Sequence, residues 1–201
     1  MNLTWRNTLR GAAAATLACG ATLAHAHTGH GATSFLQGLA HPIALDHLLA
    51  AVAVGLWSAR ALPANRVWQG PAVFLLSLVA AALAAQAGFA LPFVEQGIAL
   101  SVLLSGAMVV LACRGVTPQP AHGLVPVGAA AVLHGLAHGA EAGGASFAAY
   151  AIGFLATTAL LHATGLSAGF TLQRLRASLA RRIAYGLGAG FGAAGLYLLA
   201  A

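Results

Sequence analysis

The chain has 201 residues, of which 60% are hydrophobic and only 6% are charged, and its mean hydropathy is +0.85. About a quarter of the residues of soluble domains are charged, so this composition excludes an ordinary soluble protein and indicates an integral membrane protein. The chain contains no lysine, which excludes a nucleotide-binding P-loop of its own. The formal net charge of +6 does not indicate nucleic-acid binding, because the arginines lie in short segments between apolar runs.

The first 26 residues have the pattern of a cleaved secretory signal peptide. Two arginines precede an apolar stretch at residues 11–23, and the sequence AHA at 24–26 has the small-x-small form of a cleavage site. The alternative, a lipoprotein signal that ends at Cys19, matches the sequence less well. We therefore expect a signal peptide at 1–26 and a mature protein at 27–201.

Six apolar runs follow, each close to the roughly 20 residues that cross a bilayer. They predict transmembrane helices at about 33–59, 67–90, 93–113, 123–142, 146–171 and 182–201. The arginines of the mature chain all follow the first, third and fifth runs, which places that side in the cytoplasm. The expected fold is all-α: a polytopic membrane protein of the bacterial inner membrane, with a single six-helix transmembrane domain and both termini in the periplasm.

The first predicted helix carries His41, Asp46 and His47 in the sequence HPIALDH. An ionisable residue inside a membrane costs roughly 2.5–3.5 kcal/mol on insertion scales and usually marks an ion pathway or a ligand site. On a straight helix His41 and Asp46 would lie about 140° apart. Pro42 disfavours helix at the preceding residue, so we expect a break that turns His41 inward. The structural alternative is a proline kink with one buried Asp–His pair.

The fourth predicted helix carries His134, His138 and Glu141 in the sequence LHGLAHGAE. At 100° per residue these side chains project along one narrow stripe. Two imidazoles and a carboxylate suit a divalent transition metal such as Ni²⁺, Co²⁺ or Zn²⁺, whereas the alternative is a hydrogen-bond network without metal. Glycines at four-residue spacing, beginning at Gly135, lie beside the stripe and predict close helix packing.

The motifs HPIALDH and LHGLAHGAE are expected at similar depths in the membrane. At 1.5 Å per residue, His41 and His134 both lie about 12 Å from the periplasmic surface, and His47 lies about 20 Å from it. A site is therefore expected in the outer half of the membrane, with Glu141 above it and with these ligands: His41, Asp46, His47, His134 and His138.

Three further histidines are weaker candidates. His162, in the sequence LLHATG of the fifth predicted helix, lies about 24 Å from the periplasmic surface. It is either an inner ligand or a hydrogen-bonded packing residue. His27 and His30 follow the predicted cleavage site, where they either capture a metal ion before it enters the membrane or form a polar spacer.

These motifs resemble those of the HupE/UreJ nickel/cobalt permeases, which are found with hydrogenase or urease accessory proteins. The resemblance covers nearly the whole chain and rests on HPIALDHLLAAVAVGLW and LHGLAHGAE, with LLHATG as a weaker similarity. One difference lies in the first motif: four residues separate His41 from Asp46, where the family usually has five. On a helix this difference rotates His41 by about 100°.

The resemblance implies uptake of Ni²⁺ or Co²⁺ across the inner membrane, with hydrogenase or urease maturation proteins as partners. The metal is then the transported substrate, and neither a prosthetic group nor an enzymatic activity is expected. Two alternatives belong to other classes of protein. One is a membrane-embedded metal-dependent hydrolase with Glu141 or Asp46 as general base. The other is a haem electron carrier with two histidine ligands.

Overall fold

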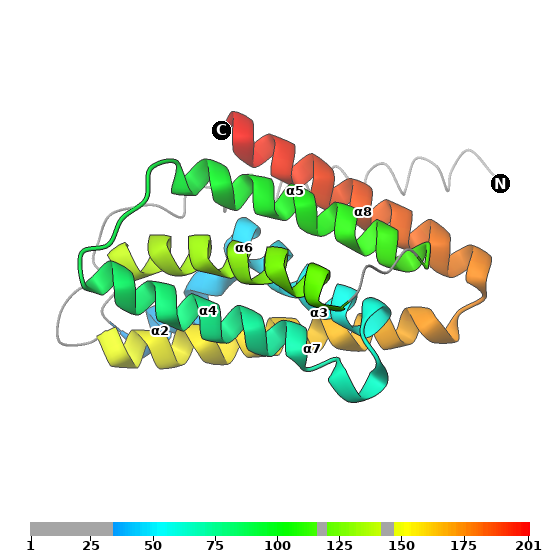
Figure 1. Ribbon diagram of the computed structural model, residues 1–201, viewed down its shortest axis with the longest axis horizontal. Coiled ribbons are helices and arrows are strands. Elements are labelled where there is room, and N and C mark those ends of the chain that lie inside the picture. Colours follow the sequence, from blue (N-terminus) through cyan, green and yellow to red (C-terminus); the bar gives the residue numbers. More distant parts are fainter. Residues whose placement is uncertain (1–33, 116–119, 142–146) are drawn as a thin grey trace.

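The computed structural model describes residues 34–115, 120–141 and 147–201; the expected signal peptide, with His27 and His30 after it, lies outside these ranges. Within them every regular element is a helix, which confirms the predicted all-α class (Figure 1). The elements are α2 (Phe35–Ala40), η1 (His41–Ile43), α3 (Leu45–Ala61), η2 (Ala64–Arg66), α4 (Gln69–Gln86), α5 (Val94–Cys113), α6 (Pro120–Glu141), α7 (Phe147–Arg174) and α8 (Ala177–Ala200).

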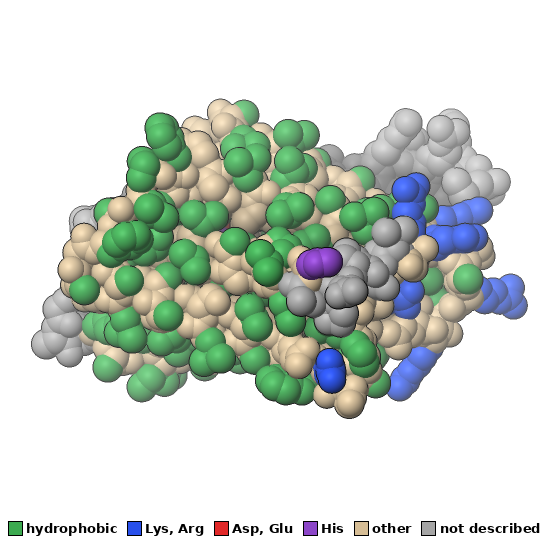
Figure 2. Space-filling view, in the orientation of Figure 1, with side chains coloured by type: hydrophobic (Ala, Val, Ile, Leu, Met, Phe, Trp, Pro, Cys, Tyr) green, Lys and Arg blue, Asp and Glu red, His purple; other side chains and the backbone are tan. Residues whose placement is uncertain are grey.

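Five of the described helices are long and apolar enough to cross a membrane, and the bent pair of Phe35–Ile43 and Leu45–Ala61 makes a sixth span if it is counted as one. A multi-pass membrane protein is therefore confirmed. The arginine side chains gather toward one end of the bundle, on the right of Figure 2. This end contains the last turns of α3, α5 and α7 and the first turns of α8. Positive charge at one end is typical of a cytoplasmic face, and the periplasmic location of the termini stays a prediction.

The helices pack mainly as three pairs, α4 with α6, α3 with α7, and α5 with α8. In Figure 1 the pair of α5 and α8 lies along the top, above the other helices. Helix α3 also contacts α4, α5, α6 and α8, and nearly all of its residues from Ala50 to Ala59 are buried. A helix that is apolar on every side is buried on every side, and α3 therefore forms the centre of the bundle.

Glycines set the contact between α4 and α6, as their spacing predicts. A Cβ atom added at Gly139 would lie 2.5 Å from the carbonyl oxygen of Ala82, and one added at Gly135 would overlap the carbonyl oxygen of Leu78. No larger residue fits this interface without separating the helices. The contact fixes how α6 is rotated in the bundle, and so it fixes the direction in which the histidines of α6 project.

The first span is broken at Pro42, and this prediction is confirmed. Helix α2 ends at Ala40, and the turn η1 follows it. Ala44 then leaves the helical region with φ −54° and ψ 143°, and α3 begins at the next residue. The chain direction bends by 74° between Phe35–Ile43 and Leu45–Ala61. Pro42 has no N–H and blocks the helix before it, and because it is buried, the break lies inside the protein.

Candidate metal centre

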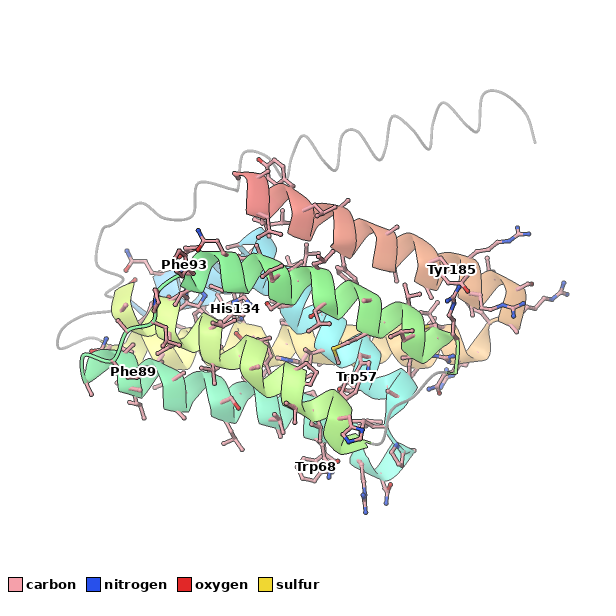
Figure 3. The ribbon with its side chains drawn as sticks, turned by 45° about the horizontal axis from the view of Figure 1, so that its top comes forward. Trp57, Trp68, Phe89, Phe93, His134 and Tyr185 are labelled. Carbon is pink, nitrogen blue, oxygen red and sulfur yellow. The ribbon has the colours of Figure 1, made fainter. Side chains whose placement is uncertain are left out.

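Three buried histidines meet close to this break. His47 comes from the first turn of α3, whereas His134 and His138 lie one helical turn apart on α6. Each offers one ring nitrogen such that the three atoms lie within 4.8 Å of one another. His47 and His134, which is labelled in Figure 3, have no exposed surface, and His138 is 4% exposed. We call these three residues the histidine cluster.

The ring of His47 stands at a steep angle to the other two rings of the histidine cluster, whereas the rings of His134 and His138 are tilted by only 30° with centroids 6.1 Å apart. The ring centroids of His47 and His134 are 5.1 Å apart with an interplanar angle of 89°. Those of His47 and His138 are 5.5 Å apart at 65°. Rings in this arrangement are not stacked face to face, so their edges, where the nitrogens are, can point toward a common centre.

His41 lies beside the histidine cluster but is not one of its three members. Its ring meets that of His138 edge-on, with centroids 4.6 Å apart, and it also packs near Tyr150 and Phe154. His41 belongs to the turn η1 and not to α3, so helical phase does not determine where its ring points. The turn therefore places His41 next to the histidine cluster, against His138.

Asp46 is half-buried, and its carboxylate is outside the group of atoms that converge within 4.8 Å. Its Oδ1 accepts a hydrogen bond of 2.8 Å from the backbone N–H of His47. The first N–H groups of a helix lack partners within the helix, and the helix dipole favours negative charge at this end. Asp46 can thus offset the charge of a bound cation from beside the cluster.

Of the remaining predicted ligands, His162 has a side chain that the structure describes, and the others do not. Glu141 is the last residue of α6, and its side chain lies outside the described residues, as do His27 and His30. His162 is 1% exposed on α7, and its ring packs against Phe74 with centroids 5.0 Å apart. The same phenylalanine contacts the ring of His134 at 5.9 Å. His162 therefore borders the cluster through an aromatic side chain.

Sequence reasoning missed three residues that surround the histidine cluster. The ring of Phe154 lies 4.7 Å from that of His47 and 4.9 Å from that of His138, and Phe74 covers another side. Thr158 Oγ1 lies 2.9 Å from Nε2 of His47. A phenylalanine in an apolar helix gives no signal of such a role. Thr158 does, because it precedes His162 by one helical turn and is therefore on the same face of α7.

Several buried ring nitrogens have no hydrogen-bond partner among the described residues. They are Nδ1 of His47, both nitrogens of His134 and Nε2 of His162. An unpaired buried polar atom costs about 1–3 kcal/mol, so its presence requires a reason. The lone pair of a neutral imidazole is a ligand that Ni²⁺, Co²⁺ and Zn²⁺ accept. The cluster therefore has the donor set and the unpaired nitrogens of a metal site.

A small cavity adjoins the histidine cluster at His138. Its volume is about 70 Å³, and apolar side chains of α4, α6 and α7, including Leu78, Tyr150 and Phe154, form most of its lining. A water molecule needs about 10–15 Å³ of such space, but it also needs about two to four polar partners. The apolar lining makes this cavity a space beside His138 and not by itself a site for a hydrated ion.

Comparison with known proteins identifies the family. The family profile described as HupE / UreJ protein matches residues 14–198. The chain belongs to the HupE/UreJ family. Protein HupE of Rhizobium leguminosarum bv. viciae is 42% identical over 147 residues, which cover 72% of this chain and 75% of the relative. No solved structure matches the chain. The resemblance predicted from the two histidine motifs is thus confirmed, and membership in the HupE/UreJ family gives no support to the hydrolase alternative.

Proposed function

We propose that this HupE/UreJ protein takes up a divalent transition metal ion, Ni²⁺ or Co²⁺, across the bacterial inner membrane. The observation that carries the proposal is the histidine cluster, three buried imidazoles within 4.8 Å of one another in a bundle of membrane-length helices. The metal ion is the substrate, and the receiving partners are hydrogenase or urease maturation proteins. No prosthetic group and no catalytic step are needed.

The chemistry of the cluster fits transport better than permanent storage. His47, His134 and His138 supply three neutral ligands of borderline softness, to which Ni²⁺ binds more tightly than Co²⁺. His41 adds a fourth imidazole beside His138. An octahedral ion with three or four such ligands keeps positions for water, so it is bound without complete dehydration and can leave again.

The direction of transport follows from the predicted topology. The ion enters from the periplasm, where Glu141 and the mature N-terminal residues His27 and His30 would meet it first. It then binds at the histidine cluster and passes His162 toward the arginine-rich cytoplasmic end. An inward-moving divalent charge gains about 4.6 kcal/mol per 100 mV of membrane potential, which is enough to drive accumulation.

Uptake into proteoliposomes under an imposed potential tests the proposal. Purified protein is expected to carry ⁶³Ni²⁺ inward at a rate that rises when the interior is made negative, with Co²⁺ as competitor. His47→Ala should abolish this flux, whereas His122→Ala should not, because His122 is an exposed histidine at the beginning of α6. Metal that binds to the wild-type protein without any flux would refute transport.

His162 is expected to affect the rate of transport more than the binding of metal. His162→Leu keeps the contact with Phe74 filled and removes the nitrogen of a site further along the path. We expect several-fold slower ⁶³Ni²⁺ uptake, with equilibrium Ni²⁺ binding by calorimetry close to that of the wild type. Equal loss of binding and uptake would instead place His162 in the same site as the histidine cluster.

A further inference from the structure

Thr158 on α7 connects His47 and His162 by two hydrogen bonds. Its hydroxyl oxygen lies 2.9 Å from Nε2 of His47. Its main-chain oxygen lies 2.8 Å from Nδ1 of His162. All three residues are buried, with exposed fractions of 1% or less. One residue is therefore in contact with both the histidine cluster and the histidine beyond it.

The hydrogen-bond donors and acceptors around Thr158 show which ring nitrogen of His47 carries the hydrogen. Thr158 Oγ1 also lies 2.8 Å from the carbonyl oxygen of Phe154, and because a carbonyl only accepts, the hydroxyl hydrogen is donated there. The opposite arrangement would leave two acceptor oxygens facing each other at this distance. The hydroxyl therefore accepts from His47, and Nε2 of His47 carries the hydrogen. A neutral imidazole has one N–H, so Nδ1 of His47 holds a lone pair.

The same reasoning gives His162 the opposite assignment. The main-chain oxygen of Thr158 can only accept, so Nδ1 of His162 carries the hydrogen and Nε2 holds the lone pair. The two lone-pair atoms, Nδ1 of His47 and Nε2 of His162, are both buried and have no hydrogen-bond partner among the described residues. In each ring the nitrogen that Thr158 does not contact is the one that can bind metal.

We propose that Thr158 is a positioning residue that holds His47 and His162 in opposite tautomers, each with its lone pair available to the transported ion. The inference rests on the proposed metal transport. A partner on the second nitrogen of a metal-binding histidine fixes both the tautomer and the ring orientation, and its loss typically costs about 10- to 100-fold in metal affinity. Helix α7 thereby acts on the site through Thr158 as well as through His162.

Thr158→Val separates the hydroxyl from the shape of the side chain. Valine has the same branching at Cβ but offers no acceptor to His47, so the two tautomers of His47 become comparable and its ring loses one restraint. We expect about 10- to 100-fold weaker Ni²⁺ binding, with restoration in Thr158→Ser. The bond to His162 uses the main chain and persists in both variants. The matched control is Thr164→Val, since Thr164 is exposed on the same helix and makes the equivalent bond to Leu160.

Nitrogen NMR of ¹⁵N-histidine-labelled, metal-free protein reads out the tautomers directly, with signals assigned by single histidine substitutions. The wild type is expected to show hydrogen on Nε2 of His47 and on Nδ1 of His162. In Thr158→Val only the signals of His47 should change, whereas a general disturbance of α7 would move both sets.

Two results would overturn the inference: hydrogen on Nδ1 of His47 in the wild type, or wild-type Ni²⁺ affinity in Thr158→Val. The NMR measurement needs neither metal nor flux, so it is independent of the transport assay. Absence of ⁶³Ni²⁺ flux in the wild-type protein would refute the proposed function. The tautomers of His47 and His162 would still be determined by the nitrogen NMR signals.

Discussion

Replacing His134 with leucine is expected to abolish Ni²⁺ binding and uptake while it raises the thermal stability of the metal-free protein. His134 has no exposed surface, and neither of its ring nitrogens has a hydrogen-bond partner among the described residues. Leucine has a similar volume and no polar atom to leave unpaired. Each unpaired buried polar atom costs about 1–3 kcal/mol, so the free energy of unfolding should rise by about this amount.

Thermal unfolding in detergent, with and without Ni²⁺, measures both effects on one sample. A ligand at 100 times its dissociation constant stabilises the native state by about 2.7 kcal/mol, so Ni²⁺ should raise the melting temperature of the wild type. It should leave the melting temperature of His134→Leu unchanged. His122→Leu is the control and should alter neither quantity, since His122 is exposed.

The sign of the change in melting temperature of the metal-free protein distinguishes a metal ligand from a structural histidine. If His134 belonged to a buried hydrogen-bond network, as the sequence alone allowed, removal of its ring would leave partners unpaired and lower the melting temperature. A lower melting temperature of metal-free His134→Leu would therefore contradict the interpretation of His134 as a metal ligand. Improved stability with lost binding is the trade-off expected of a functional site.

The parts of the fold that the sequence predicted depend on local physics. Runs of apolar residues require helices in a membrane, because no water satisfies the backbone there. Pro42 breaks the first span whatever surrounds it, since its missing N–H and its ring act on adjacent residues. Gly139 predicts a close helix contact, although only the structure shows that the partner is Ala82 of α4.

The parts of the site that sequence could not supply depend on neighbours distant in the chain. The direction of His41 could not be obtained from helical phase, because the backbone at that residue is a turn between two helices. Phe74 and Phe154 border the histidines but are ordinary apolar residues in their own helices. Thr158 could be placed one turn before His162, but its bond to His47 spans 111 residues and follows from the packing of α7 on α3.

Asp46→Asn is expected to impair Ni²⁺ binding and uptake strongly while it leaves the fold intact. The amide oxygen of asparagine can accept the hydrogen bond from the backbone N–H of His47 just as the carboxylate does. The negative charge, however, is lost. At an effective dielectric constant of about 20, two unit charges about 4 Å apart attract each other by about 4 kcal/mol, and the attraction doubles for a divalent cation and falls in proportion to distance. Because solvent and the ion's own water offset part of this attraction, we expect a loss of affinity of at least about tenfold.

Asp46→Ala separates the two roles of the aspartate. It removes the charge and also the hydrogen-bond acceptor, so it should lower the free energy of unfolding by about 1 kcal/mol, whereas Asp46→Asn should not. Ni²⁺ uptake should fall alike in both variants. If uptake instead survived in Asp46→Asn and fell only in Asp46→Ala, the aspartate would serve only as a hydrogen-bond acceptor in the first turn of α3, and the cation's charge would have to be offset elsewhere. Imidazole ligands bring no negative charge of their own, so within the described part of the chain Asp46, which directly precedes His47, is the carboxylate placed to balance the ion.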